Sequence, residues 1–344
     1  MNRLKARSFL VVAVILLVLH GCAGIYSVVE FEVLEPATVN FPDHVNQLVI
    51  LNRAPFTLDV FEKEDREGME DEHLVIVDTL ISNNTFRGLL TMLRESPIEN
   101  FHTPFWLSER RRDTSVLDDL ILTKPEVETI LSRYGGDALI SLEYYYLDLD
   151  EHYDYFQNEP NITRTHYYEL SNHLKWNIHM PLSPKPFDTY IMVDTMYFTD
   201  IVDGEFRATS SVSEMIGELF YNSGAKYGRY LVPVWNHASR ILYKGKGDSL
   251  KMASKFTDVG EWEEAFDIWK ELTYTSYDSL TISKAYHNMA VYYELEDRLD
   301  SASFLVDMAL AYDSLELVEN YREELDIRLL NQQEVREQVA SPRE

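Results

Sequence analysis

The stretch that decides the fold of the N-terminal half is TKPEVETILSRYGGDALISLEY, residues 123–144. Thr123 is well suited to cap a helix, Pro125 falls in the first turn, and acidic side chains follow, which a helix N-terminus favours. The pair Gly135-Gly136 predicts where this helix ends. The compact apolar run after the glycines predicts a buried strand. A helix that leads directly into a strand indicates an α/β layer.

The residues before this stretch show the same alternation of strand and helix. Residues 47–53 are a compact apolar run that ends in polar residues, as expected of a buried strand. The highly charged residues 62–73 predict a solvated loop, and their spacing lacks the pattern of an EF-hand calcium site. A helix is then predicted to begin near Asn83 or Asn84 and to end before Pro97.

The residues after this stretch predict further strands and then helices. Residues 150–166 are acidic and aromatic and are interrupted by a proline, which favours a loop. Alternating patterns at residues 174–180 and 190–201 predict two strands. Later the apolar period becomes helical, which predicts one helix over residues 213–232 and a second helix over residues 235–243.

From Asp248 onward the sequence is helical and repetitive. Residues 283–314 follow the tetratricopeptide (TPR) pattern of large and small residues without a gap, and the preceding segment repeats it. Small residues are needed where paired antiparallel helices approach closely. A long helix after Ser314 would cap the array, and a generic pair of helical hairpins is the alternative interpretation. The TPR-like positions are Met252, Ala253, Phe256, Gly260, Trp262, Ala265, Trp269, Tyr286, Met289, Ala290, Tyr293, Ala302 and Ala309.

The N-terminus has the features of an export signal. Basic residues precede an apolar run of eleven residues, 9–19, which is too short to span about 30 Å of hydrocarbon as a helix. The ending Leu19-His20-Gly21-Cys22 resembles the lipobox of bacterial lipoproteins, although His20 is unusual at its position. Cys22 is the single cysteine of the chain, so it has no intrachain disulfide partner after export. We therefore predict that Cys22 is acylated.

Together these patterns predict an α/β (or α+β) N-terminal domain followed by an all-α TPR-like helical repeat domain. No segment after the signal is long and apolar enough for a membrane span, so the lipid is predicted to be the membrane anchor. The predicted boundaries are 1–21 for the lipoprotein signal peptide, 22–42 for a lead-in or tether, 43–245 for the α/β domain, and 246–344 for the TPR-like repeats with a C-terminal capping helix.

The composition and motifs exclude several classes of function. The formal net charge is −27, and so acidic a protein repels the phosphate backbone of nucleic acids. The sequence lacks nucleophile signatures, a cysteine pair for zinc and a glycine-rich phosphate loop. His152 beside Glu151 and Asp154 comes nearest to a metal cluster, but the spacing is not specific. We therefore predict no enzyme activity, no cofactor and no metal site.

Several segments carry a resemblance to a known family: residues 49–53, 134–143, 224–235, 262–269 and 284–291. In this order they resemble a family of Bacteroidota lipoproteins, a domain of unknown function with an α/β N-terminal half and TPR-like C-terminal repeats. The resemblance covers nearly the whole chain after Cys22 and implies location and architecture, but no reaction. Surface-exported lipoproteins of that phylum carry acids directly after the acylated cysteine, whereas here the first acid is Glu30. This difference implies the periplasmic face of the outer membrane.

Two classes of function remain open. The first is an interaction scaffold whose TPR-like tail holds a peptide or helix of a partner protein. Residues 248–344 carry 9 basic and 22 acidic side chains, which favours a basic partner. The alternative is a glycan-binding lipoprotein of a nutrient-capture system, because TPR-bearing sugar-capture lipoproteins exist in the same phylum. An enzyme is the weakest interpretation.

The tyrosine clusters do not decide between these classes. Tyr144-Tyr145-Tyr146 and Tyr167-Tyr168 could stack on sugars, but alternate tyrosines on a strand are more often half-buried packing. The sequence therefore predicts no obvious aromatic platform. A flat, exposed row of aromatic side chains would indicate glycan binding, and a concave groove on the repeats would indicate a scaffold. Polar side chains that converge in a deep pocket would indicate an enzyme.

Overall fold

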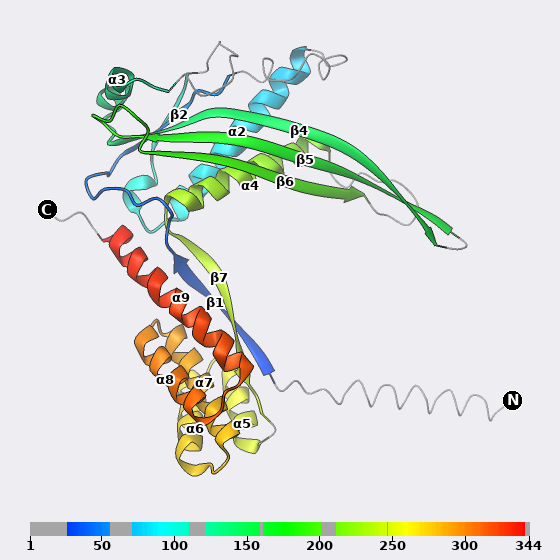
Figure 1. Ribbon diagram of the computed structural model, residues 1–344, viewed down its shortest axis with the longest axis vertical. Helices are drawn as coiled ribbons and strands as arrows, with labels where there is room; N and C mark the ends of the chain where they lie inside the picture. The colour runs from blue at the N-terminus through cyan, green and yellow to red at the C-terminus, as the bar shows by residue number, and fades with distance from the viewer. Residues whose placement is uncertain are drawn as a thin grey trace. The chain divides into compact units, whose positions relative to one another are not determined.

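A computed structural model of the chain describes residues 26–55, 71–109, 121–158, 161–200, 211–245 and 247–340. These residues divide into two units (Figure 1). The sheet unit comprises residues 35–235 and the residues from 335 onward, and the helical unit comprises the residues up to 34 together with residues 236–334. The predicted signal peptide, Cys22 and most of the predicted loop at 62–73 lie outside the described residues.

The sheet unit is built on a five-stranded sheet with the order β3-β2-β4-β5-β6. β2 (Leu48–Asn52) pairs in parallel with β3 (Phe105–Ser108) and with β4 (Ala138–Asn158). β4 forms an antiparallel hairpin with β5 (Asn161–His179), and β6 (Asp188–Asp200) lies antiparallel to β5. Every residue of β2 is buried, which explains its continuous apolar sequence. The strands predicted at 47–53, 174–180 and 190–201 are confirmed.

α3 (Lys124–Tyr134) begins and ends where the sequence predicts. The carboxylate of Glu126 accepts a hydrogen bond of 2.8 Å from the main-chain N–H of Thr123, which satisfies a free donor at the start of the helix. Gly135 ends the helix with a φ of +65°, a conformation that glycine adopts without strain. α3 packs its buried Val127 and Leu131 against β2 and the beginning of β4.

α2 (Asp71–Glu95) and α4 (Val212–Leu231) form a layer over the opposite face of the sheet (Figure 1). Their core includes Phe86 and Phe220, and the ring of Tyr227 stacks on that of Trp176 at 4.4 Å. α2 begins at Asp71 and not at Asn83 or Asn84, so the end of the predicted loop belongs to the helix. A short 3-10 helix, η2 (Glu99–Phe101), follows α2.

Three further predictions about local structure are wrong. Residues 150–166 are not a loop. β4 continues as far as residue 158, and β5 begins at residue 161. The two segments pair with each other from Asp150 and Glu169 to Asn158 and Asn161. Residues 235–243 form a strand, β7 (Val234–Tyr243), and part of the predicted lead-in forms β1 (Tyr26–Glu35). β1 and β7 pair in a separate two-stranded sheet.

The C-terminal part of the chain is helical from α5 to α9, as predicted. Successive helices α5 to α8 pack against one another around a common core. The two units divide between residues 235 and 236, because β7 and most of β1 pack with the helices. The domain boundary at 245/246 stays a prediction. The helices are α5 (Asp248–Thr257), α6 (Trp262–Thr275), α7 (Ser279–Leu295), α8 (Leu299–Tyr312) and α9 (Glu316–Val339).

The TPR-like positions lie on α5 to α8 and in the turn between α5 and α6. Gly260 occupies that turn with a φ of +81°. Met252 differs from the expected packing, because its side chain is 49% exposed. The nearby Leu250 is buried in the core of the helical unit instead. The assignment of these helices to the TPR class stays a prediction. The fully buried positions are Ala253, Ala265, Ala290, Ala302 and Ala309, with Trp269 and Met289 nearly so, and the partly buried ones are Phe256, Trp262, Tyr286 and Tyr293.

Candidate functional site

The candidate site is the face of the sheet opposite to α2 and α4. α3 covers this face only over β2 and the beginning of β4. Farther along β4, β5 and β6, alternate side chains point away from the core, and Ile191 and Tyr197 are 66% and 62% exposed. We call this surface the open face. It comprises Tyr144, Tyr146, Asp148, Asp150 and His152 of β4, Tyr167, Glu169, Ser171, His173 and Lys175 of β5, and Ile191, Val193, Thr195 and Tyr197 of β6.

A β-bulge decides which tyrosines reach the open face. The pairing of β4 with β5 passes from Leu142 to Tyr144 and leaves Glu143 as the extra residue. Strict alternation from the buried Leu142 would turn Tyr144 into the core and Tyr145 outward. The bulge reverses this, so that Tyr145 is buried against α4 and two tyrosines, Tyr144 and Tyr146, lie on the open face.

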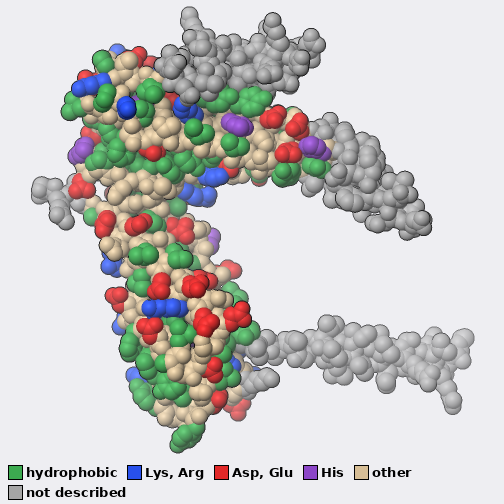
Figure 2. All heavy atoms as spheres, in the orientation of Figure 1, with side chains coloured by type: hydrophobic (Ala, Val, Ile, Leu, Met, Phe, Trp, Pro, Cys, Tyr) green, Lys and Arg blue, Asp and Glu red, His purple; other side chains and the backbone are tan. Residues whose placement is uncertain are grey.

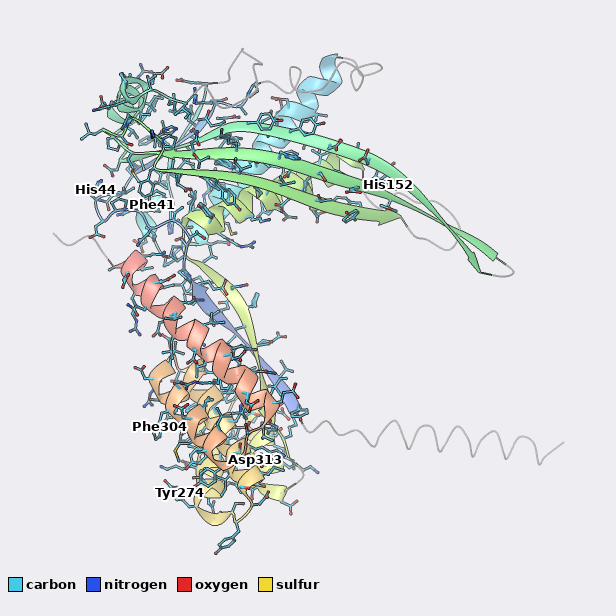
Figure 3. All side chains as sticks on the ribbon, in the orientation of Figure 1. Phe41, His44, His152, Tyr274, Phe304 and Asp313 are labelled. Atoms are coloured by element: carbon cyan, nitrogen blue, oxygen red, sulfur yellow. The ribbon has the colours of Figure 1, made fainter. Side chains whose placement is uncertain are left out.

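The rings of the open face form two groups along the strands. In the first group, the rings of Tyr146 and His173 lie edge to face, with centroids 6.0 Å apart. In the second group, His152 stacks on Tyr167 at 4.9 Å, and Tyr167 lies 6.2 Å from Tyr197. Figure 3 shows His152 on β4, well beyond the end of the sheet that α3 covers. A polar row, formed by Asp148, Ser171 and Thr195, separates the groups.

The surroundings raise the pKa of two phenol groups of the open face, those of Tyr144 and Tyr197. Partial burial raises the pKa of Tyr144, and the nearby Tyr146 raises it further. The carboxylate of Glu169 raises the pKa of Tyr197 and accepts a hydrogen bond of 3.3 Å from its hydroxyl. The Nε2 atom of His152 lies 3.2 Å from the same carboxylate. The face therefore presents aromatic rings together with O–H donors and carboxylate acceptors.

A buried ionic cluster lies beside the first group of rings. The Arg53 guanidinium donates to both carboxylate oxygens of Glu143 at 2.9 and 2.8 Å, and the Ser141 hydroxyl donates to the same carboxylate at 2.6 Å. Burial lowers the pKa of the neighbouring His179, against the opposing effect of Glu143. The cluster fixes the bulge residue in place. Sequence reasoning missed it because 90 residues separate Arg53 from Glu143.

Comparison with known proteins assigns the chain to a family. Residues 45–243 match a family described as Domain of unknown function (DUF8603). The chain belongs to this family. The DUF8603 match contains the whole open face, from Tyr144 to Tyr197. Residues 251–332 match a second family, Domain of unknown function (DUF6340). The matched region begins within α5 and ends within α9. The prediction of a family of unknown function is confirmed in this coarse form, and its lipoprotein and TPR character stay predictions.

Other comparisons add little to the DUF8603 assignment. A search of curated proteins gave no match. Among solved structures, the chain is similar to a neuraminyllactose-binding hemagglutinin homologue from Helicobacter pylori. The sequences are 11% identical, the match covers 56% of this chain and 86% of that chain, and the TM-score is 0.32. So low a TM-score does not establish a shared fold.

The DUF8603 region also borders a cavity of about 330 Å³ within the sheet unit. Phe41, Asn46 and Glu99 line it, together with residues at the end of α9. The side-chain amide of Gln338 holds this end of α9, because it pairs with both main-chain groups of Ala37 at 2.9 and 2.8 Å. The cavity contains none of the open-face residues. It shows no converging set of catalytic groups among its lining residues.

Metal ligands and membrane spans are not found among the described residues. No group of three His, Cys, Asp or Glu side chains there is close enough to hold a metal ion. His152, the candidate of the sequence, pairs with Glu169 across the strands. None of the described helices has an apolar stretch long enough to cross a membrane.

In the helical unit, one face of α7 is already occupied by β7. The side-chain amide of Asn288 accepts from the main-chain N–H of Tyr243 and donates to its carbonyl, both at 2.8 Å. The His287 ring bonds to the carbonyl of Ile241 at 2.8 Å. An extended peptide partner would have to displace β7 from this face. This face of α7 is therefore not an open groove.

His287 makes the stability of the helical unit depend on pH. A carbonyl can only accept, so Nε2 carries the proton, and the buried Nδ1 is left without a hydrogen bond. Burial lowers the pKa of His287 from 6.5 to about 4. Between these values the unfolded chain binds more protons than the folded chain. Acidification through this window is therefore expected to reduce the free energy of unfolding by up to about 3 kcal/mol.

Urea unfolding at a series of pH values measures this effect. His287→Gln keeps a donor for the Ile241 carbonyl but does not titrate, so the variant should lose less stability between pH 6.5 and 4. The exposed His237 provides the matched control, His237→Gln, which should follow the unsubstituted protein. Equal pH dependence in all three proteins would refute the assignment.

Proposed function

We propose that this chain is a lipid-anchored protein of the cell envelope that binds glycans on the open face of its sheet. The observation that carries the proposal is the row of tyrosine and histidine rings that α2 and α4 leave uncovered. Such a row is the feature expected of a glycan-binding protein. Because β7 already occupies one face of α7, a partner peptide could bind there only by displacing β7.

The length of the open face fits an oligosaccharide better than a single sugar. Tyr144 and His152 are eight residues apart on one strand. At about 3.4 Å per residue, they are separated by about 27 Å. Two groups of rings lie within this distance, with a polar row between them. The arrangement suits a chain of sugars that contacts aromatic rings near both ends.

The chemistry of the open face suits the two kinds of surface that a sugar presents. A tyrosine ring offers a flat apolar surface for the C–H faces of a pyranose, and its hydroxyl remains available for hydrogen bonding. Asp148, Ser171 and Thr195 offer acceptors and donors for sugar hydroxyls between the rings. Convergent polar groups of this kind fix the orientation of a bound ligand.

The charge of the open face favours neutral glycans over acidic ones. Asp148, Asp150 and Glu169 are acidic, and Lys175 is the basic residue of the face. A carboxylated sugar such as sialic acid would meet net repulsion there. The proposed ligand is therefore a neutral oligosaccharide.

The proposed location follows from the lipobox-like sequence. Acylation of Cys22 would hold the protein on a membrane, and the lack of acids directly after Cys22 favours the periplasmic face of the outer membrane. A glycan-binding protein at this location would meet oligosaccharides that have entered the periplasm.

Replacing one tyrosine of each ring group tests the proposal. In a glycan array followed by titration with the best ligand, Tyr146→Ala and Tyr197→Ala are each expected to weaken binding about tenfold, the equivalent of about 1.4 kcal/mol. Tyr197 is exposed, so its loss should leave the stability of the protein nearly unchanged. The unsubstituted protein should prefer neutral over sialylated glycans.

The control is Tyr274→Ala, which removes an exposed tyrosine from α6 of the helical unit. It should leave glycan binding unchanged. Equal binding by Tyr197→Ala and the unsubstituted protein, or no glycan binding at all, would contradict the proposal.

The second candidate function is the capture of a basic protein partner by the acidic helical unit. Exposed hydrophobic side chains of this unit, such as Tyr274 and Phe304, would add apolar contacts to the attraction between charges (Figure 3). This function predicts no response to the open-face variants.

A further inference from the structure

Basic residues are concentrated in one segment of this acidic chain. Residues 244–255 carry four lysines and a single acid, Asp248, although the chain as a whole has a net charge of −27. Figure 2 shows one side of the helical unit, on which acidic side chains predominate. Charge is therefore unevenly distributed over this unit.

α5 presents these lysines to solvent on one face. Leu250, Ala253 and Ser254 are buried on its inner face. Lys251 and Lys255 are exposed on the outer face, with the half-exposed thioether of Met252 between them. The helix thus combines a basic outer face with an apolar side chain, as membrane-surface helices do.

The residues before α5 connect this basic face to the beginning of β1. The ring of Tyr243 lies 5.4 Å from that of Tyr26, the first residue of β1, and the Lys284 ammonium lies 5.4 Å from the Tyr243 ring. A Cβ atom at Gly245 would lie only 2.4 Å from the side chain of Leu250, so this connection packs tightly on α5. The lysines therefore lie at the end of the helical unit where β1 starts.

We propose that Lys244, Lys251, Lys255 and Lys284, with Met252, form a face by which the helical unit docks on an anionic lipid bilayer. The inference rests on the proposed acylation of Cys22 for its location. Three residues separate Cys22 from Tyr26, and four steps of 3.8 Å reach at most about 15 Å. The anchor would thus bring this end of the unit, and not a distant surface, next to the lipid headgroups.

The acids near the face limit the affinity but do not cancel it. Asp248 is exposed at the start of α5, Asp258 lies 3.5 Å from the Lys244 ammonium, and Asp313 is near Tyr243. Asp278 is a fourth acid, beside Lys284, so the acids equal the lysines in number. The positive charge offered to the lipid therefore comes from Lys251 and Lys255, which are exposed on the outer face of α5. A weak contact is sufficient for a protein already held by its lipid, because the tether makes docking intramolecular. Docking would then fix the orientation of the helical unit on the membrane.

Vesicle binding of the unacylated protein tests this face directly. The mature chain from residue 22, with Cys22→Ser, is mixed with vesicles of phosphatidylcholine alone or with added phosphatidylglycerol, and the bound fraction is measured by sedimentation. Binding should rise with phosphatidylglycerol and fall with salt. Each lysine near an anionic surface contributes about fivefold in binding. Lys251→Glu/Lys255→Glu is therefore expected to reduce binding at least about 20-fold.

The matched control is Lys185→Glu/Lys270→Glu, which makes the same change in net charge at exposed lysines outside the face. It should bind nearly as well as the starting protein. Equal binding to both kinds of vesicle, or an equal loss in both double variants, would overturn the proposal. Radiolabelled palmitate tests the anchor separately, since Cys22→Ser should abolish its incorporation. If the protein binds the anionic vesicles but the chain with Cys22 incorporates no palmitate, the proposed anchor is refuted and the lipid-binding face is still supported.

Discussion

Replacing Glu294 with leucine is expected to lower the free energy of unfolding by about 3–5 kcal/mol. Glu294 on α7 is fully buried, and its carboxylate accepts hydrogen bonds from Arg240 of β7 at 2.8 Å and from Arg328 of α9 at 2.7 Å. The variant leaves two largely buried guanidinium groups without their shared acceptor. Removal of one partner from a buried ion pair is strongly destabilising, because the remaining charge is still desolvated.

Urea denaturation measures this loss, and Glu324→Leu provides the control. Glu324 also contacts Arg240, at 2.8 Å, but its side chain is 55% exposed. An exposed ion pair contributes at most about 1 kcal/mol. Similar losses in the two variants would mean that the buried carboxylate does not join β7, α7 and α9 as described.

Gly224→Ala is expected to destabilise the sheet unit by about 3 kcal/mol. A Cβ atom at this position of α4 would lie 1.9 Å from the main-chain carbonyl oxygen of Thr85 on α2. Backbone atoms cannot move aside as a flexible side chain can, so the two helices would have to separate. Because these helices form the layer that supports the sheet, the midpoint of thermal unfolding should fall as well.

Gly217→Ala on the same helix is the control for this variant. The atoms nearest to its Cβ would be those of the side-chain amide of Asn84, at 3.3 Å and beyond. Alanine is favoured over glycine in a helix by about 1 kcal/mol. The control should therefore be as stable as the unsubstituted protein or slightly more stable. Loss of stability to the same extent in both variants would show that the close approach of α2 and α4 is not what requires Gly224.

The sequence predicts the fold best where local chemistry decides it. The capping residues around α3 and the two glycines after it give the limits of that helix to within a residue. The buried alanines of the tail mark helix contacts, since only small side chains fit there. In both cases the information lies within a few residues of the element that it determines.

The sequence fails where a distant partner decides the structure. Residues 235–243 have a spacing of apolar residues that fits a helix, yet they pair with β1, and the main chain of Tyr243 is bound by Asn288, 45 residues later. The ends of β4 and β5 look like a loop in composition, but each stabilises the other by pairing. Long-range pairing of this kind leaves no local signal.

The open face was missed for a related reason. The tyrosines of β4 are visible in the sequence, but their orientation depends on the bulge at Glu143, which Arg53 holds from the end of β2. Which side of the sheet stays uncovered depends on α2 and α4. For these tyrosines the sequence predicts half-buried packing on a strand, and for residues 150–166, which include His152, it predicts a loop.

A crystal structure of the protein with the best neutral oligosaccharide from the array tests the central claim most directly. We predict density for sugar rings stacked on Tyr146 or Tyr197, with hydroxyls bonded to the polar row of Asp148, Ser171 and Thr195. Density in the cavity lined by Phe41, or against the helical unit, with the open face empty, would contradict the account.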